Sequence, residues 1–528
     1  MARTRHGCLT LVVLAVLAAS GDTHGELGDV HTSAASVARL VEAEQTVVAA
    51  LQDYLAREEA RLEAIRGYIA GWRGGAADYV HNPLNSYFFL WRLTKEFPAV
   101  LDALDPTPTE ELRHNLSSLR GGVEVPREAD LNGVAFALVR LQDTYNLTVD
   151  DLVQGDIWGR KAVHVLSADD CFRLGQQSFN NLEFGLSEQW YNKGLALLAG
   201  QQPLTQEEQQ RIERVSRQQE HRAVMSKMVT QLAQHSDGHI HDRFSGLGLP
   251  ISFQQQVYAN HEGADSVKLL NDLYRRLCRG EEVQPPQAFI GLKCGYVFGS
   301  SAYHRLMPFK AELRWADPII IVYHDALTEA ETEVLKRVSM PRLATTMVHS
   351  FTTHQVRKSL ARVGKTAWVR RGDDATVDDI LRRIEHMTGL TTATAEDLHV
   401  LNYGIGGHYD AHVDFFDLED KAMDKTPHQG DRLATMLFYL NDVEAGGSTV
   451  FPTVGVEVAA RRGSALFWFN LKRNGRGDYR TVHAACPVLL GEKWSEWAAL
   501  CVCVCVCVSQ KSSTGHAVKW LSKTIMMR

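Results

Sequence analysis

The sequence predicts an α+β protein of several domains, in which a helical N-terminal region precedes a strand-rich C-terminal domain at 317–500. Three observations support this fold class. A helical pattern without proline spans 33–72, and helical patterns continue through 129–198. From residue 318 onward, short β-branched and aromatic runs alternate with glycine and polar turns, as in a sandwich or jelly roll with helices packed outside. A chain of 528 residues has room for about three or four domains.

The composition and the N-terminus indicate a globular protein of the secretory pathway. Hydrophobic residues make up 45% of the sequence, and the net charge of -7 argues against a broad nucleic-acid-binding surface. No internal segment approaches the roughly 18 uninterrupted apolar residues that span a bilayer, so no membrane span is expected. Residues 1–20 have the basic start, apolar run and small residues of a signal peptide. Sequons at Asn115 and Asn146 are candidate glycosylation sites.

The helical region divides into two predicted domains. Residues 21–145 are expected to form an association domain, because apolar residues recur every seven positions from Val41 to Ile69. This seam fits a coiled coil and, equally, an amphipathic helix packed within its own domain. Residues 146–250 form the second domain, where 170–198 has the spacing of one tetratricopeptide-like helix-turn-helix repeat. Its aromatic residues, favoured as helix–helix core over a peptide groove, are Phe172, Phe179, Phe184, Trp190 and Tyr191.

Residues 251–316 are interpreted as a linker with short elements. Cys278 and Cys294 lie sixteen residues apart in this stretch, which contains glycine and proline. They lack the two-residue spacing and the paired histidines of a zinc site. A structural disulfide between them is therefore expected, and it would contribute about 3 kcal/mol in the chain-entropy model.

The strand-rich domain begins with the β-branched run at 319–323, which suits a buried strand. Helices are expected near 327–339 and 376–389. The remaining strand candidates are separated by glycine and polar turns. They lie at 398–403, 408–414, 433–440, 448–451, 464–470, 480–485 and 494–500.

Candidate metal ligands lie on two of these strands. Residues two apart in a strand point to the same face, so His412 and Asp414 would present an imidazole and a carboxylate side by side. With His483 they would complete the two-histidine, one-carboxylate set that holds non-haem Fe(II). Ten residues further on, Lys493 offers a compact positive charge for the far carboxylate of a co-substrate such as 2-oxoglutarate. His408 shares the strand parity of His412 but not the His-x-Asp spacing, and it is taken as non-ligating.

Longer motifs around these residues resemble the α subunit of collagen prolyl 4-hydroxylase. The resemblance is close over 318–494 and weaker through the helical region, at Asn82-Pro83 and at Asp170-Cys171-Phe172. The motifs that carry it are Tyr403 to Tyr409 (YGIGGHY), His412 to Asp414 (HVD), Arg432 to Thr435 (RLAT), Phe438 to Leu440 (FYL), Ala445 to Pro452 (AGGSTVFP), Ala465 to Trp468 (ALFW), Gly477-Asp478 and His483 to Leu489 (HAACPVL).

The resemblance implies a fold, an activity and partners. The fold would be a double-stranded β-helix (jelly-roll) dioxygenase domain. Its activity would be the hydroxylation of C4 of proline in X-Pro-Gly collagen-like sequences, coupled to oxidative decarboxylation of 2-oxoglutarate, in the endoplasmic reticulum lumen. Procollagen would be the substrate, and protein disulfide isomerase would be the β subunit of an α2β2 heterotetramer.

The resemblance also implies roles for individual residues. The three candidate ligands would hold Fe(II), and Lys493 would pair with the C5 carboxylate of 2-oxoglutarate. Tyr403 is similar to a tyrosine that helps to hold the same carboxylate, and Thr449 would be its neighbour. L-ascorbate would rescue iron oxidised in uncoupled turnovers.

The C-terminus departs from the family pattern. After Lys493-Trp494 the family continues with a second Lys-Trp, whereas this chain has Ser495-Glu496-Trp497 and, from Cys501, four Cys-Val pairs. A translated TG dinucleotide repeat produces such an alternation, so residues from about 495 are interpreted as read-through or a gene-model error, with an aberrant low-complexity tail at 501–528. The alternative is a genuine strand with its cysteines on one face. A genuine tail would be expected to damage the last core strand and to leave Cys486 without its usual partner.

Two other functions stay open. One is a non-catalytic collagen-binding or assembly subunit, motivated by the altered tail and repeat region. The other is a 2-oxoglutarate hydroxylase that acts on another residue, such as lysine, because such an enzyme shares the metal site.

Overall fold

The computed structural model describes residues 32–70, 128–162, 165–181, 183–200, 206, 209–210, 212–216, 264–299, 301–349, 356–358, 361–415 and 431–502. The chain forms two compact units, one at 36–126 and the other comprising 1–35 together with 127–528. The predicted signal peptide, the sequon at Asn115 and the tail beyond residue 502 lie outside the described residues.

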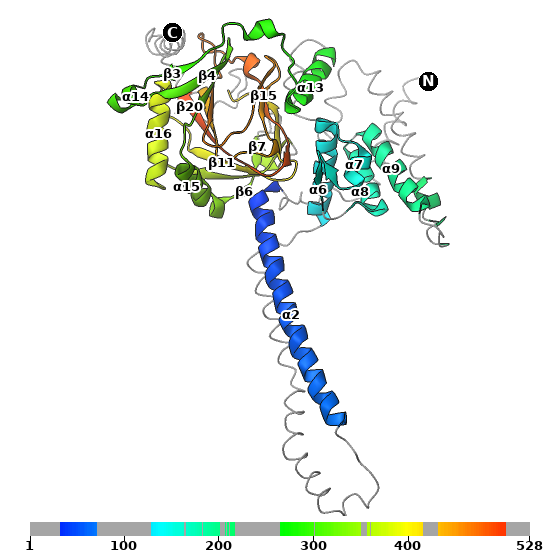
Figure 1. Cartoon of the computed structure of the whole chain (residues 1–528). Helices are drawn as coiled ribbons and strands as arrows, with labels where there is room; N and C mark the ends of the chain where they lie inside the picture. The colour runs from blue at the N-terminus through cyan, green and yellow to red at the C-terminus, as the bar shows by residue number, and fades with distance from the viewer. Residues whose placement is uncertain are drawn as a thin grey trace, which may run out of the picture. The chain divides into compact units, whose positions relative to one another are not determined.

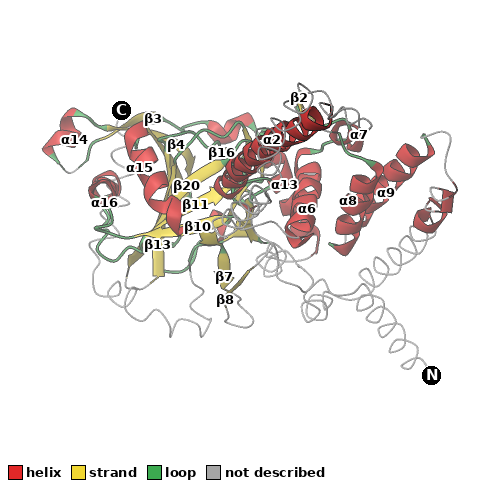
Figure 2. Ribbon diagram, turned by 90° about the horizontal axis from the view of Figure 1, so that it is seen from below, coloured by secondary structure: helices red, strands yellow, loops and turns green. Residues whose placement is uncertain are grey.

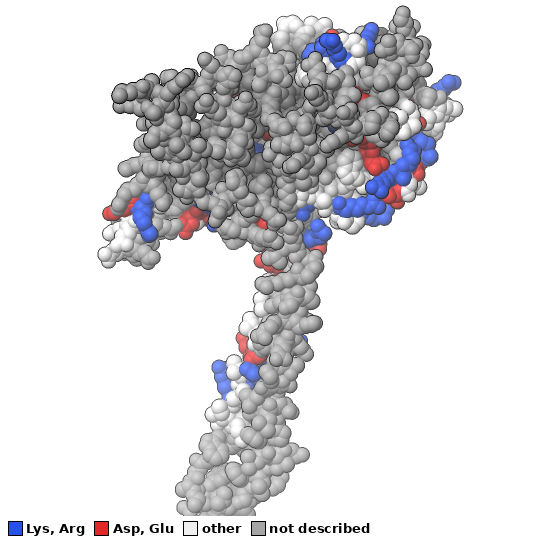
Figure 3. Space-filling view, turned by 180° about the vertical axis from the view of Figure 1, so that it is seen from behind, with Lys and Arg blue, Asp and Glu red and all other residues white. Residues whose placement is uncertain are grey.

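The long helix expected at 33–72 is confirmed as α2 (Ala34–Ala70), which runs without interruption for 37 residues (Figure 1). Its surface carries local ion pairs, such as Arg57 with Asp53, and Figure 3 shows basic and acidic side chains close together on the described part of the helix. Among the helices that the structure describes, none has both the length and the apolar character needed to cross a membrane. The apolar seam is exposed at Val41, Val48, Leu51, Leu55, Leu62 and Ile69.

The second helical region is built around α6 (Glu128–Tyr145), α8 (Ala168–Asn180) and α9 (Phe184–Ala199). Helix α8 packs against both α6 and α9, and the three lie side by side in Figure 2. Trp190 and Tyr191 are buried, which confirms them as helix–helix core. Gly175 allows this packing, because a Cβ at that position would lie 2.8 Å from the Tyr191 ring. The shorter elements of the region are α7 (Val149–Val153), β1 (Asp156–Ile157) and β2 (Arg160–Lys161).

Two antiparallel sheets form the strand-rich domain. The larger has nine strands in the order β3-β4-β5-β17-β13-β20-β11-β10-β6, and the smaller has five in the order β16-β15-β18-β12-β9. The larger sheet comprises β3 (Cys294–Val297), β4 (Phe309–Ala316), β5 (Ile319–His324), β17 (Ala465–Phe469), β13 (Asp431–Tyr439), β20 (Lys493–Val502), β11 (Leu398–Tyr403), β10 (Lys365–Val369) and β6 (Ala344–Thr345). The smaller sheet comprises β16 (Val456–Val458), β15 (Thr449–Phe451), β18 (His483–Ala485), β12 (His408–His412) and β9 (Arg362–Val363).

Alternation along the strands divides the core into two layers. On one face of the larger sheet, side chains such as Val400 and Phe438 pack against α15 (Glu329–Ser339) and α16 (Ala375–Thr388). Figure 2 shows these two helices beside the sheet. On the opposite face, Trp468 and its neighbours pack against the smaller sheet.

The other elements are α13 (Ala264–Cys278), α14 (Ala302–Leu306), η4 (Pro286–Phe289), η5 (Met340–Arg342), η7 (Tyr479–Thr481), and the strand pairs β14 (Ala445–Gly446) with β19 (Val488–Leu490) and β7 (Met347–His349) with β8 (Val356–Lys358).

The strands expected after residue 398 are present as β11, β12, β13, β15, β17, β18 and β20, and the two expected helices are α15 and α16. Part of the stretch interpreted as a linker is instead built into the larger sheet. Strand β4 pairs with β5 along its length, and β3 pairs with β4. Neither strand has the β-branched run of β5, so its place depends on pairing rather than on its own composition.

Strand β20 occupies the middle of the larger sheet. It pairs with β11 on one side, from Lys493 to Trp497, and with β13 on the other, from Ser495 to Val502. The expectation that this last core strand is damaged is therefore wrong for the residues described. Within this strand the carboxyl group of Glu496 is buried opposite Phe438 without a hydrogen-bond partner. Burial raises the pKa of Glu496 well above its usual value.

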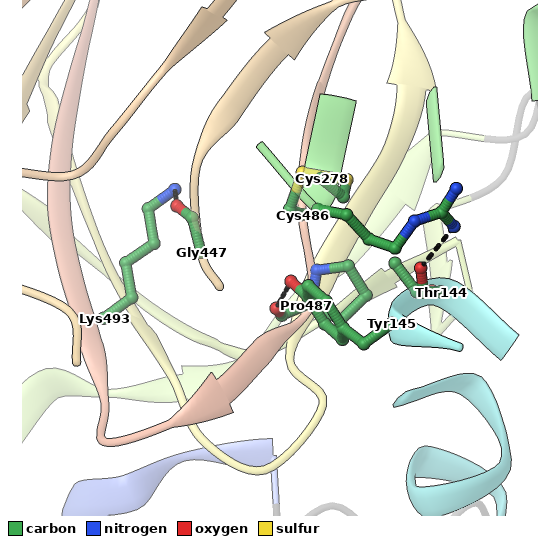
Figure 4. Close-up of a disulfide and its surroundings, with 8 residues drawn as sticks. Thr144, Tyr145, Cys278, Gly447, Cys486, Pro487 and Lys493 are labelled. Atoms are coloured by element: carbon green, nitrogen blue, oxygen red, sulfur yellow. Dashed lines mark hydrogen bonds between the residues drawn. A yellow bond between two sulfur atoms is a disulfide. The ribbon is translucent and has the colours of Figure 1, made fainter. Parts of the chain in front are cut away.

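The disulfide expected between Cys278 and Cys294 is wrong. Cys278, at the end of α13, is bonded to Cys486, with 5.5 Å between their Cα atoms (Figure 4). Both half-cystines are buried in one apolar cluster, whereas Cys294 is an exposed free cysteine on β3. Tyr145 of α6 reaches the same place and donates a hydrogen bond to the Pro487 carbonyl at 2.5 Å. Tertiary packing, not nearness in sequence, decided the pairing, and Cys486 has a partner.

Replacing Cys486 with serine should lower the free energy of unfolding by about 3–5 kcal/mol, because the disulfide closes a loop of 208 residues. Denaturant unfolding without reductant measures the loss. Cys294→Ser is the matched control and should leave the stability close to that of the native chain. An equal loss in both variants, or a peptide map that links Cys278 to Cys294, would contradict the pairing.

Candidate metal centre

Strand pairing in the smaller sheet brings the three candidate metal ligands together. His412, the last residue of β12, lies directly opposite His483, the first residue of β18. Asp414 follows two residues after His412, just beyond the end of the strand. Its two carboxylate oxygens lie 3.6 Å from the Nε2 atoms of the two histidines. The three ligand atoms fall within 4.8 Å of one another, and all three residues are buried.

Backbone carbonyls orient both imidazoles. Nδ1 of His412 donates a hydrogen bond to the Asp410 carbonyl at 2.8 Å, and Nδ1 of His483 donates to the Thr481 carbonyl at 3.0 Å. A proton held on Nδ1 leaves the lone pair of each ring on Nε2. Both lone pairs are therefore directed into the space beside Asp414.

Hydrogen bonds also orient the Asp414 carboxylate. The Thr435 hydroxyl of β13 donates to Oδ2 at 2.6 Å, and the Trp497 indole of β20 donates to the same oxygen at 3.3 Å. The Asn470 amide donates in turn to the Thr435 hydroxyl at 2.9 Å. Oδ2 thus accepts two hydrogen bonds from the protein, and Oδ1 is left for a metal.

Burial and neighbouring charge set the protonation of the ligands. Burial alone would raise the pKa of Asp414, but the adjacent imidazoles of His483 and His412, together with Arg432, hold it well below its usual range. Burial and the neighbouring ring of His412 lower the pKa of His483 to about 4. At neutral pH the group is therefore an anionic carboxylate beside a neutral His483 imidazole, as a divalent metal requires.

The donor set fits a non-haem iron and not a structural zinc. Two imidazole nitrogens and one carboxylate oxygen form a facial triad with open positions, whereas structural zinc is normally enclosed by four ligands that include cysteine. Aromatic rings line the ligands, since Tyr409 stacks on His412 with 3.6 Å between centroids and Trp468 lies 4.6 Å from His483. Such walls exclude water from the ligand side of the site.

Lys493 forms a second polar position in the same interior. It is 1% exposed, and its ammonium group donates to the Gly447 carbonyl at 2.6 Å (Figure 4). The ring centroids of Tyr403 and Tyr439 lie 5.9 Å and 5.5 Å from its Nζ atom. Burial lowers the pKa of Lys493 to about 7. A carboxylate that entered this position would find a desolvated positive charge.

Strand geometry sets the spacing between this lysine and the metal ligands. Lys493 and Trp497 lie four residues apart on one face of β20, and Tyr439 and Thr435 lie four apart on one face of β13. Lys493 and Tyr439 lie at one position, where the lysine is next to the tyrosine ring. Trp497 and Thr435 lie at the other, where both donate hydrogen bonds to Asp414. Four residues of strand span about 13 Å. The lysine and the metal ligands therefore occupy separate positions along the same pair of strands.

The structure brings together the residues that the sequence singled out. Tyr403 lies beside Lys493, and Thr449 joins the same region by accepting a hydrogen bond from the Tyr439 hydroxyl at 2.8 Å. His408 lies instead with the Asp410 carboxylate, 3.3 Å away, and is not in the three-residue group. Asn146 is exposed in the turn after α6, so its glycosylation stays a prediction.

Sequence reasoning missed several residues that support the site. Thr435 and Trp497 orient Asp414, while Tyr439 and Gly447 surround Lys493. Strand parity carried a usable signal, because Trp497 shares a face with Lys493 and Thr435 shares one with Tyr439. No pattern in the sequence indicated that these two strands are neighbours.

Two family models match the chain. Residues 33–159 match the prolyl 4-hydroxylase alpha-subunit, N-terminal region, and residues 398–497 match the 2OG-Fe(II) oxygenase superfamily. A solved structure of a viral collagen prolyl hydroxylase from Paramecium Bursaria Chlorella virus-1, in complex with 2OG, is 23% identical with a TM-score of 0.28. That alignment covers 34% of this chain and 94% of the viral one.

Full-length relatives match over most of the chain. Prolyl 4-hydroxylase subunit alpha-2 of Caenorhabditis elegans is 34% identical over 506 residues, which cover 91% of this chain and 92% of the relative. Subunit alpha-1 of Rattus norvegicus is 33% identical, and that of Homo sapiens is 32% identical, each covering 88% of this chain and 92% of the relative. The chain belongs to the prolyl 4-hydroxylase alpha-subunit family.

Proposed function

We propose that this chain is a procollagen-proline 4-dioxygenase, which couples oxidative decarboxylation of 2-oxoglutarate to hydroxylation of proline at C4 in X-Pro-Gly sequences. One observation carries the proposal. The buried group His412, Asp414 and His483 lies in the same interior as the buried amino group of Lys493, in a chain of the prolyl 4-hydroxylase alpha-subunit family.

Each residue of the site has a physical role in this reaction. His412, Asp414 and His483 would hold Fe(II), which when bound supplies the activation of oxygen that couples the two oxidations. Lys493 binds the C5 carboxylate of 2-oxoglutarate, and the hydroxyls around Tyr439 complete its surroundings. Thr435 keeps the Asp414 carboxylate in one orientation. L-ascorbate serves as the reductant that restores oxidised iron.

We further propose that the two facing antiparallel sheets are a double-stranded β-helix, or jelly roll. The match to the oxygenase superfamily and the position of His412 and His483 on paired strands of the smaller sheet support this. The packed pair α8 and α9 supports a tetratricopeptide-like repeat for a proline-rich substrate. The exposed seven-residue seam of α2 supports a coiled coil.

The proposal extends to assembly and compartment. Procollagen is the proposed substrate, and protein disulfide isomerase is the proposed β subunit of an α2β2 heterotetramer. A signal peptide at 1–20 and glycans at Asn115 and Asn146 fit the endoplasmic reticulum lumen. The disulfide between Cys278 and Cys486 fits an oxidising compartment.

The purified protein should produce succinate and a hydroxylated product from a Pro-Pro-Gly peptide, with Fe(II), 2-oxoglutarate and ascorbate present. Mass spectrometry of matched proline and lysine peptides separates the proposed activity from a lysyl hydroxylase. His412→Ala should abolish both turnover and iron binding, because it removes a ligand, whereas His408→Gln should retain iron. Peptide binding without succinate would favour a non-catalytic collagen-binding subunit. Iron retained by His412→Ala but lost in His408→Gln would overturn the ligand assignment.

Replacing Thr435 with valine should weaken Fe(II) binding roughly tenfold or more, because a partner that orients a metal-bound group is lost. Thr435→Ser keeps the hydroxyl and is the matched control. Iron content after dialysis against graded metal buffers gives the affinity. Equal affinities for the valine and native proteins would show that this hydrogen bond does not set the ligand geometry.

The affinity for 2-oxoglutarate should fall as the pH rises above 7, by about tenfold for each pH unit. Burial lowers the pKa of Lys493 to about 7 in the free protein, so above that pH the neutral amine must take up a proton before it can pair with a carboxylate. Below pH 7 the lysine is already charged and the affinity should level off. Calorimetric titration between pH 6 and 9 measures the profile.

Lys493→Gln is the control for this pH profile. It should bind 2-oxoglutarate weakly, because its amide carries no charge, and the affinity should not change with pH, because the amide does not titrate. A profile unchanged by this substitution would assign the pH dependence to another group.

A further inference from the structure

We propose that Asn402 is a positioning residue that links the start of helix α2 to the backbone carrying Tyr403 and Lys493, and so sets the affinity for 2-oxoglutarate. This inference rests on the proposed function of Lys493. It gives residues 32–35 a role at the co-substrate site, although more than 360 residues separate them from Asn402 in sequence.

Asn402 accepts the first hydrogen bonds of α2. Its side-chain oxygen accepts from the Ser33 hydroxyl at 2.5 Å and from the Ala35 amide at 3.2 Å. The first N–H groups of a helix have no partner within the helix, and a side-chain oxygen normally supplies one from the preceding residue. Here a residue of β11 supplies it. Asn402 and Ser33 are both 0% exposed, so water does not replace this contact.

A backbone hydrogen bond reinforces the contact. The Gly404 amide donates to the Thr32 carbonyl at 3.1 Å. Residues 32–35 therefore hold β11 on both sides of Tyr403, through the side chain of Asn402 and the main chain of Gly404. A segment held at both neighbours has little freedom to shift.

The other end of the Asn402 amide reaches the residues around Lys493. Its nitrogen donates to the Glu492 carboxylate at 3.3 Å, and the Trp494 indole donates to the same oxygen at 2.9 Å. Asn441 completes this cluster: its amide donates to the Glu492 carbonyl at 2.8 Å, and its oxygen accepts from the Trp494 amide at 2.6 Å. Both neighbours of Lys493 are thus held by side-chain hydrogen bonds.

The strand register connects these hydrogen bonds to the positions of Tyr403 and Lys493. Asn402 pairs with Trp494, and Tyr403 pairs with Lys493, in adjacent positions of β11 and β20. Alternation places the Asn402 and Trp494 side chains on one face of the sheet and those of Tyr403 and Lys493 on the other. Asn402 does not touch the co-substrate position. It acts through the backbone on the two residues that would grip the C5 carboxylate.

Binding of 2-oxoglutarate should therefore depend on residues 32–35 at the start of α2. Lys493 is buried with its ammonium donating to a single backbone carbonyl, so small shifts of its strand change how well it meets a carboxylate. Loss of the Ser33 or Asn402 contact should therefore weaken 2-oxoglutarate binding more than peptide binding or metal binding.

The experiment compares full-length variants that differ by single groups. Asn402→Asp keeps an acceptor for Ser33 and Ala35 but replaces the amide that donates to Glu492 with a second carboxyl group, and Ser33→Ala removes one donor to Asn402. Thr46→Ala is the matched control, because Thr46 is an exposed residue of α2 whose hydroxyl donates to the Glu42 carbonyl of the same helix. Each protein is loaded with Fe(II), kept free of oxygen and titrated calorimetrically with 2-oxoglutarate, and KM values are then measured for 2-oxoglutarate and for a Pro-Pro-Gly peptide.

Asn402→Asp should raise the Kd and the KM for 2-oxoglutarate about tenfold, the lower end of the effect that loss of an outer hydrogen-bond partner has at metal sites. Ser33→Ala should raise both about threefold, the effect of one ordinary hydrogen bond. The peptide KM, kcat and iron content should stay at native values, and Thr46→Ala should match the native protein throughout. Such a split would not follow from a general loss of structure, because that would change all the constants together.

Native affinity for 2-oxoglutarate in both variants would overturn this inference, even if their melting temperatures fall. Parallel losses of 2-oxoglutarate, peptide and iron binding would also overturn it, in favour of a general structural role for Asn402. If the native protein itself binds no 2-oxoglutarate, the proposed function fails and this inference fails with it. If the native protein binds 2-oxoglutarate and both variants bind it with the same affinity, only the role of Asn402 is overturned.

Discussion

The antiparallel register between β12 and β18 is the constraint on which the site depends. It sets His412 opposite His483, and Asp414 follows two residues after His412. A slip of one residue in either strand would turn one imidazole to the other face of the sheet. The disulfide at Cys486 lies three residues beyond His483, and its partner Cys278 comes from helix α13. This register is therefore anchored by covalent bonding as well as by the ladder.

The interior keeps its charges apart. Asp414 is surrounded by imidazoles and accepts hydrogen bonds from Thr435 and Trp497, while Lys493 contacts a backbone carbonyl and aromatic rings. Neither group neutralises the other, because strand spacing holds them at separate positions. A buried lysine in such surroundings opposes folding. The same desolvation strengthens its attraction for an entering carboxylate, so the site exchanges stability for affinity.

Local sequence pattern was a good guide wherever a segment had its own periodicity. The proline-free run became α2, and the β-branched run at 319–323 became β5. Pattern was a poor guide where tertiary contacts decide. The stretch containing β3 and β4 resembles a linker, and Cys294 lies nearer than Cys486 to Cys278 in sequence, yet packing in a shared apolar cluster selected Cys486. Strand β20 also formed despite the buried carboxyl group of Glu496, because pairing on both sides outweighs one unfavourable residue.

The amino-acid sequence by itself determined the helical and strand segments, the His-x-Asp pair with His483, and the candidate lysine, because these follow from composition, period and spacing within short stretches. Only the tertiary structure decided which strands are neighbours. That choice placed Thr435 and Trp497 on Asp414, paired Cys278 with Cys486, and brought Ser33 to Asn402. The physical reason is that these contacts join residues far apart in the chain, and their energies arise only when the whole core is packed.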